Sequence, residues 1–106
     1  MKTHFSCPVE VTLSIIGGKW KPGILWQLHD GPRHFSDLRR SLPRITHKVL
    51  TSQLRQLERD GVVSRVDGAY VLSRFGQTLR KALDELAGWG KRNSARYDAI
   101  VEDPPT

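Results

Sequence analysis

The chain has 106 residues, of which 38% are hydrophobic and 26% are charged. This length and composition predict one small globular core and exclude an intrinsically disordered chain. No apolar run approaches the roughly 18 residues that a membrane helix needs, and the first residues lack the apolar stretch of a secretory signal. We therefore expect a single cytoplasmic domain over residues 1–106, with its core at 7–97 and a frayed tail at 98–106. The single cysteine fits a reducing compartment.

Positive charge is concentrated in the middle of the chain. Seventeen Lys and Arg residues outweigh eleven Asp and Glu residues, which gives a net charge of +6. Between residues 33 and 65, eight basic residues and three acidic ones give 8 − 3 = +5. The basic residues of this stretch are Arg33, Arg39, Arg40, Arg44, Lys48, Arg55, Arg59 and Arg65. Such a cluster is typical of a protein that binds a phosphate backbone, although a solvated basic face without a partner has the same composition.

Two helices are predicted at the start of the chain. Pro8 suits the first turn of a helix over residues 8–16, where apolar residues recur at helical spacing until two glycines end the pattern. A second helix is expected from about Lys19 to the turn at 30–32. Gly23 lies inside it and costs about 1 kcal/mol relative to alanine, so this helix depends on tertiary contacts.

A short helix and a longer one follow. Ser36 is a suitable N-cap for a helix over residues 37–42, which a proline stops. Thr46 can cap the next helix, and Gly61 is a natural end to it. The core stripe of this longer helix is Leu50, Leu54 and Leu57.

The last third of the chain predicts a hairpin and a final helix. Two β-rich runs, 62–66 and 69–72, are joined by Asp-Gly, which is a strong hairpin signal. Ser73 is expected to cap a long helix that continues toward Tyr97. Its apolar residues are Leu79, Ala82, Leu83, Leu86 and Trp89. The whole order predicts a mainly α fold with a small β-hairpin wing, which is a winged helix-turn-helix.

One face of the longer helix is suited to DNA. With Leu50 set at 0° and each residue turning about 100°, the three leucines define the buried side. The opposite side carries Lys48, Ser52, Arg55 and Arg59, and Thr51 and Gln56 flank it. Lys48, Thr51, Ser52 and Arg55 lie in the part of a recognition helix that enters the major groove, while Arg59 is placed to meet phosphate. An ordinary exposed helix would also favour Lys and Arg, because both are good helix formers.

Further contacts are expected outside this helix. Arg39 and Arg40, on the preceding helix, extend the same basic region. Ser36 and Thr46 each precede a helix, so they combine an N-terminal N–H with a hydroxyl that can bind phosphate, beside their role as N-caps. Arg65 is the one basic residue of the predicted hairpin strands and turn. The two-residue turn carries an acid at its tip, which does not favour a reach of the wing into the minor groove.

Several motifs occur in a fixed order along residues 7–89. They are Cys7-Pro8-Val9, residues 16–22 (IGGKWKP), 31–40 (GPRHFSDLRR), 45–51 (ITHKVLT), 54–63 (LRQLERDGVV), and 70–73 (YVLS) with Gly76. Together they resemble the HxlR-type winged helix-turn-helix transcriptional regulators, a MarR-related family of bacteria and archaea. Compared with that family the wing is short, and Gly23 replaces a bulky apolar residue, which implies looser packing of the second helix.

The resemblance implies a sequence-specific regulator of transcription, expected to be a repressor. It implies a homodimer built from the first and last helices, with two recognition helices in successive major grooves of double-stranded DNA and hence a palindromic operator. The residues agree with this, because Leu79, Leu83 and Leu86 offer more apolar surface than a small domain can cover by itself.

Cys7 is a candidate sensor, because some members of the family sense oxidants or electrophiles through a cysteine at this position. A thiol at a helix N-terminus has its thiolate stabilised by the helix dipole. With one cysteine in the sequence, oxidation would give an intersubunit disulfide, a mixed disulfide or a sulfenic acid. The alternative, a small residue that packs at the dimer interface, is equally open.

Other classes of site find little support. No pair of His or Cys residues has the spacing of a metal site, so we expect neither metal nor cofactor. The three tryptophans are expected in the core and the dimer interface, with a pocket for a small aromatic effector as the alternative. No catalytic grouping indicates an enzyme. The remaining alternative is a protein–protein interaction module, which would need an apolar patch on the outer face of the longer helix.

Overall fold

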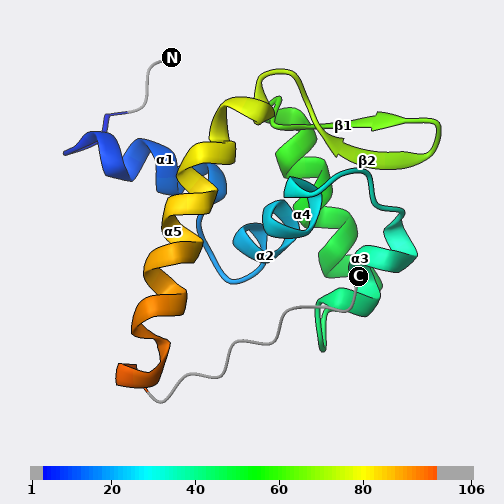
Figure 1. The fold of residues 1–106 in the computed structure, drawn as a ribbon. Helices are drawn as coiled ribbons and strands as arrows, with labels where there is room; N and C mark the ends of the chain where they lie inside the picture. The colour runs from blue at the N-terminus through cyan, green and yellow to red at the C-terminus, as the bar shows by residue number, and fades with distance from the viewer. Residues whose placement is uncertain (1–3, 98–106) are drawn as a thin grey trace.

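A computed structural model describes residues 4–97 and is a winged helix-turn-helix (Figure 1). The tail predicted at 98–106 lies outside the described residues. Within residues 4–97, no helix is both long and apolar enough to cross a membrane. The elements are α1 (Pro8–Ile16), α2 (Lys21–His29), α3 (Phe35–Ser41), α4 (His47–Arg59), β1 (Val63–Val66), β2 (Ala69–Leu72), η1 (Gly76–Leu79), α5 (Arg80–Asn93) and η2 (Ser94–Tyr97). The mainly helical architecture with one antiparallel hairpin confirms the predicted fold class.

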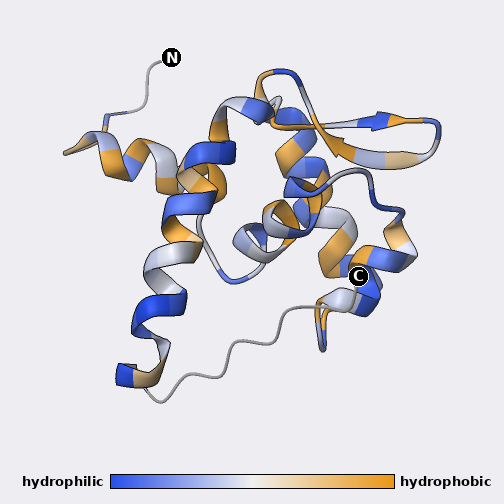
Figure 2. Cartoon of the chain, in the orientation of Figure 1, coloured by the Kyte–Doolittle hydropathy of each residue, from blue (hydrophilic) through white to orange (hydrophobic). Residues whose placement is uncertain are grey.

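α2 lies at the centre of the core. Ile24 and Leu25 are fully buried, and α2 packs against α1, α3, α5 and β2. Figure 2 shows hydrophobic residues on both α2 and α4, and the buried residues of the two helices belong to one core cluster. A Cβ at Gly23 would lie 2.9 Å from Leu42 Cδ2. The looser packing expected at Gly23 is therefore wrong, because the Leu42 side chain fills the space that the glycine leaves.

α3 begins one residue earlier than its predicted cap. The N-cap is His34, whose backbone N–H donates to the Asp37 carboxylate at 3.2 Å. Ser36 is therefore not the N-cap but an exposed residue of the first turn. Phe35 packs partly against the core, and this contact fixes where the helix starts.

α4 agrees with the prediction at both ends and along its buried side. The Val49 N–H donates to the Thr46 hydroxyl at 3.1 Å, so Thr46 is the N-cap. The buried residues of α4 are Leu50, Leu54 and Leu57. Gly61 follows the helix with φ +79°, a left-handed conformation in which glycine is unstrained.

The wing is a tight hairpin. Val63 pairs with Leu72 and Val66 pairs with Ala69 across antiparallel strands. Asp67 and Gly68 have φ values of 51° and 82°, as a type I′ turn requires. On its other edge, Tyr70 exchanges two backbone hydrogen bonds with Arg33, of 2.8 and 3.0 Å, so the loop before α3 is attached to β2.

The segment after the wing differs from the single long helix predicted there. The Ser73 hydroxyl accepts from the Gly76 N–H at 2.8 Å and donates to the Gly61 carbonyl at 2.5 Å. Ser73 thus bonds to the first residue of the short 3-10 helix η1, whose N-cap is Phe75, and α5 starts only at Arg80. Gly76 makes this junction compact, because a Cβ there would lie 2.0 Å from the Val62 carbonyl oxygen.

α1 and α5 lie on the side of the molecule away from α3 and the hairpin (Figure 1). α5 buries Leu83 against α2, whereas Leu86 remains 60% exposed and Trp89 56% exposed. Figure 2 shows hydrophobic residues along α1 as well. On α1, the exposed apolar residues are Val9, Val11 and Leu13. This apolar face is left uncovered by the described residues.

Candidate nucleic-acid interface

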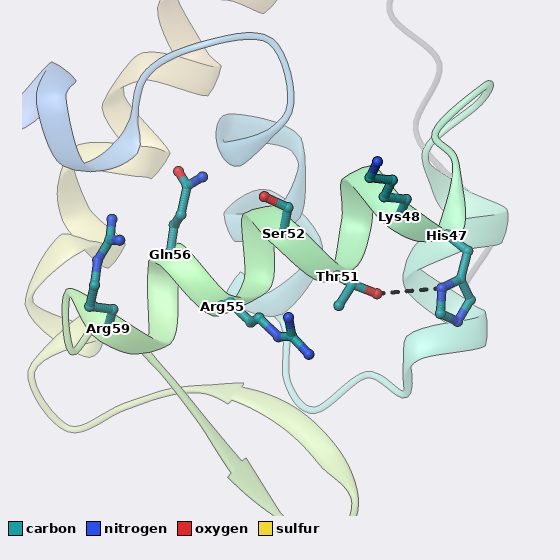
Figure 3. A pocket seen from close by; sticks show the side chains of 7 residues that line it. All are labelled: His47, Lys48, Thr51, Ser52, Arg55, Gln56 and Arg59. Atoms are coloured by element: carbon teal, nitrogen blue, oxygen red, sulfur yellow. Dashed lines mark hydrogen bonds between the residues drawn. The ribbon is translucent and has the colours of Figure 1, made fainter.

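The outward side of α4 carries a hollow that is lined entirely by side chains of this helix (Figure 3). The lining residues are His47, Lys48, Thr51, Ser52, Arg55, Gln56 and Arg59. Because the leucines on the opposite side are buried, the helix cannot rotate these side chains away from solvent. The structure thus brings together five of the predicted contact residues, namely Lys48, Thr51, Ser52, Arg55 and Arg59.

Two cations of this surface have no partner in the described chain. Lys48 and Arg55 are exposed, and neither side chain makes a hydrogen bond or ion pair with any residue of 4–97. Arg59 has a weak ion pair, with its Nε 3.9 Å from the Asp60 carboxylate. Exposed pairs of this kind contribute little to stability. The charge of α4 is therefore available to an anionic ligand.

The two arginines of α3 differ in this respect. Arg40 donates to the Asp37 carboxylate one turn earlier on the same helix. Arg39 is exposed and has no such partner among the described residues. Of the two predicted phosphate contacts, Arg39 is the one that needs no rearrangement.

The starts of α3 and α4 lie close together. The rings of Phe35 and His47 pack with their centroids 4.6 Å apart. His47 Nδ1 is also 3.5 Å from the Thr51 hydroxyl (Figure 3). Ser36 and Thr46 sit at these two helix starts, although only Thr46 caps a helix with its hydroxyl. Both helix N-termini thus add backbone N–H groups, which favour anions, to the basic surface.

Three residues at this surface were not predicted as contact residues from the sequence, namely His47, Gln56 and Lys21. His47 and Gln56 line the hollow but fall off the centre of the predicted face. Lys21, at the start of α2, donates to Gln56 Oε1 at 2.7 Å. The side-chain amide N–H groups of Gln56 make no hydrogen bond with residues 4–97, and glutamine amides bind adenine edges. The polar side chain of Gln56, beside the predicted face, indicated that it could belong to this surface. Nothing in the sequence indicated its contact with Lys21, 35 positions away.

Arg65 does not line the hollow. Its guanidinium stacks over the Tyr70 ring at 4.6 Å from the centroid and donates to the Tyr70 hydroxyl. This hydrogen bond raises the pKa of Arg65 above its ordinary value. The wing arginine is therefore held against its own hairpin.

Cys7 is exposed at the N-cap of α1. Its side chain makes no capping hydrogen bond, and the neighbouring Ser6 donates from its N–H and its hydroxyl to the Glu10 carboxylate. These bonds lower the pKa of Glu10. Cys7 is thus accessible in the described chain, at the N-terminus of α1 rather than beside α4.

A second hollow lies between α2 and α5 and is mainly apolar. It is lined by Pro22, Trp26, Leu83, Leu86, Ala87, Gly90 and Lys91. Trp20 and Trp26 are partly buried against the core, whereas Trp89 is exposed and stacks on Tyr97. Within residues 4–97, no three His, Cys, Asp or Glu side chains gather as a metal site would require.

Comparison with known proteins gives the same picture over most of the chain. Residues 15–98 match the family model of the HxlR-like helix-turn-helix. The uncharacterized HTH-type transcriptional regulator YdeP of Bacillus subtilis is 44% identical over 101 residues, which cover 89% of this chain and 79% of YdeP.

Solved structures of similar proteins share the fold. The redox regulator HypR in its oxidized form is 42% identical and superposes with a TM-score of 0.76, covering 82% of this chain and 97% of HypR. Quinone-bound YodB from B. subtilis is 31% identical with a TM-score of 0.71, covering 81% of this chain and 99% of YodB. These relatives are regulators, and none of them indicates an enzyme family.

Proposed function

The chain belongs to the HxlR-like helix-turn-helix family of DNA-binding transcriptional regulators, and on that premise we propose that it is a homodimeric repressor that recognises a palindromic operator. The observation that carries the proposal is the outward side of α4, where Lys48 and Arg55 are exposed without an internal partner. Arginine and lysine donate to guanine O6 and N7 in the major groove, so these two residues read bases.

Other residues position the helix on the duplex. Arg39 and Arg59 contact phosphate, and Arg40 does so when it leaves Asp37. Ser36 and Thr46 offer helix N-termini to the backbone, and Thr51 and Ser52 add hydroxyl contacts within the groove. Arg65 is stacked on Tyr70, so the wing contributes least to recognition.

The homodimer is proposed from the apolar face of α1 and α5. Its exposed residues include Val9, Leu13, Leu86 and Trp89. A monomeric protein rarely leaves such a patch uncovered, and a twofold dimer covers it with the same patch of a second copy. Two copies of α4 then face two half-sites about one helical turn apart, which is why the operator is expected to be palindromic.

Cys7 is proposed as a redox or electrophile sensor. It is exposed at a helix N-terminus, and the similar protein HypR is a redox regulator. A disulfide between the two copies or a sulfenic acid would change α1, which belongs to the proposed dimer interface. The competing role for Cys7 is packing within that interface.

The test is fluorescence anisotropy with the DNA upstream of the protein's own gene, measured at two salt concentrations with scrambled DNA as competitor. Binding that survives the competitor is expected; equal binding to both DNAs would reduce the function to non-specific charge. Oxidant should weaken specific binding of the wild type and leave a Cys7→Ser variant unchanged. If oxidant weakens specific binding by the wild type and by Cys7→Ser to the same extent, Cys7 is not the sensor. The interaction-module alternative gains no support, because the outer side of α4 is polar.

A further inference from the structure

Two residues other than glycine have a left-handed backbone within residues 4–97. They are Arg44, with φ 70°, and Asp67, with φ 51°. Most L-residues avoid this region because the Cβ approaches the carbonyl oxygen, whereas Asn and Asp adopt it as single residues and glycine does so freely. Asp67 is thus an ordinary choice for its hairpin turn. Arg44, with a long side chain, has no such local reason to be there.

The turn between α3 and α4 requires the left-handed conformation. The Ile45 N–H donates to the Leu42 carbonyl at 3.2 Å, which closes a four-residue turn with Pro43 second and Arg44 third. Proline at the second position and a positive φ at the third are the signature of a type II turn, whose third position favours glycine. Leu42 and Ile45 are both buried, so the turn cannot relax without disturbing the core.

No contact inside the described chain offsets the strain at Arg44. Its side chain is exposed and makes no hydrogen bond or ion pair with residues 4–97. Its position is nevertheless specific, two residues before the Thr46 cap and four before Lys48, at the end of α4 that a recognition helix directs into the groove. Figure 3 shows this turn standing beside the start of α4. Strained residues concentrate at functional sites, because selection retains them for a contact made elsewhere.

We propose that Arg44 contacts a DNA phosphate and that this contact is the reason an arginine occupies a glycine-type position. The proposal rests on the DNA-binding function of α4. A guanidinium can bind phosphate oxygens in a bidentate manner. Since a phosphate contact carries no sequence information, Arg44 strengthens binding to every duplex alike and helps to set the depth of α4 in the groove.

The test compares Arg44→Gly, Arg44→Lys and two controls on one probe, a fluorescein-labelled random duplex of about 30 base pairs titrated with salt. Arg44→Gly should raise the melting temperature by a few degrees and reduce the slope of log Kobs against log[salt] by about 0.9 for each protomer bound. Arg44→Lys should keep the slope, because lysine also neutralises a phosphate. Asp67→Gly relieves the other left-handed residue, and Lys81→Gln removes a charge from α5; neither should reduce the slope.

Two results would overturn the proposal. If Arg44→Gly is more stable yet keeps the wild-type slope, the arginine is merely tolerated in the turn. If Arg44→Gly melts at a lower temperature, the turn does not favour glycine and the argument from strain fails. If the wild type binds no duplex at any salt concentration, DNA binding by this chain is itself disproved. If the wild type binds and Arg44→Gly has the same salt slope, only the proposed Arg44 contact is disproved.

Discussion

α4 and α5 are amphipathic helices of similar length, with 13 and 14 residues, but they use their apolar sides differently. α4 buries Leu50, Leu54 and Leu57 and presents a polar outer side. α5 buries Leu83, while Leu86 and Trp89 remain more than half exposed. The described chain thus completes the packing of α4 and leaves that of α5 incomplete. One surface is suited to a charged partner and the other to an apolar one, so the two can be disrupted separately.

The largest expected effect comes from the apolar face. Leu86→Glu places a charge in the proposed dimer interface and should convert the dimer to a monomer. Because two linked recognition helices bind more tightly than one, affinity for the operator should fall by about 100-fold or more. Light scattering after size-exclusion chromatography measures the assembly, and anisotropy measures the affinity.

Val66→Glu is the matched control for this change. Val66 is 55% exposed on the wing, close to the 60% of Leu86, but lies outside the α1 and α5 face. It should leave the dimer intact. If Leu86→Glu is also dimeric, the apolar face has another role.

A change on the polar side should act on DNA alone. Arg55→Ala is expected to weaken specific binding by about 1–3 kcal/mol and to relax specificity, because a base contact is lost. The melting temperature should stay near that of the wild type, since Arg55 is exposed and unpaired within the described chain. Anisotropy with operator and scrambled DNA measures the loss. Glu58→Ala, on the same helix outside the hollow, serves as control; an unchanged operator affinity in Arg55→Ala would mean that the reading face is wrongly assigned.

The start of α4 should affect stability more moderately. Thr46→Ala removes the oxygen that accepts from the Val49 N–H, and it should lower the free energy of unfolding by about 0.5–2 kcal/mol. Thr46→Ser retains that oxygen and should lose much less. Urea denaturation of both variants checks this, and equal losses would show that the methyl group rather than the cap matters.

The smallest expected effect is that of Glu10→Gln, at the start of α1, on the melting temperature, and this effect should depend on pH. The pKa of Glu10 lies below its ordinary value of 4.5 because Ser6 donates to the carboxylate. The stabilisation is therefore present above the unfolded pKa and is lost as the pH falls through the folded pKa. Melting temperatures of the wild type and Glu10→Gln should differ slightly at neutral pH and converge in acid. A difference that grows in acid would contradict the sign of the shift.

Much of the fold could be predicted from short-range signals. The Thr46 cap, the three leucines of α4, Gly61 and the Asp-Gly turn each specify a local conformation, and all were confirmed. The start of α3 was predicted wrongly, because Asp37 accepts from the His34 N–H and Phe35 packs inward. The start of the predicted long helix also differs, because Ser73 bonds to Gly61, which is distant in sequence, and α5 begins only at Arg80.

The candidate site likewise has a part that local sequence signals predict and a part that depends on tertiary packing. The side chains on the outer side of α4 follow from helical periodicity, so the sequence placed Lys48, Ser52, Arg55 and Arg59 together. The contact between Lys21 and Gln56 depends on how α2 crosses α4 and has no local signal. The left-handed φ of Arg44 was also not predicted, because its cause is the burial of Leu42 and Ile45 on both sides of the turn.

The backbone pairing of Tyr70 with Arg33 has a consequence for the behaviour of the protein at high concentration. A two-stranded hairpin usually presents two open edges, and open edges are templates for aggregation. Here the loop before α3 occupies the outer edge of β2 at Tyr70, which leaves the four-residue β1 as the open edge in the described chain. That strand is short and carries Arg65, both of which discourage pairing with another molecule. Tyr70 thus protects the wing against fibril-like association, a hazard independent of DNA.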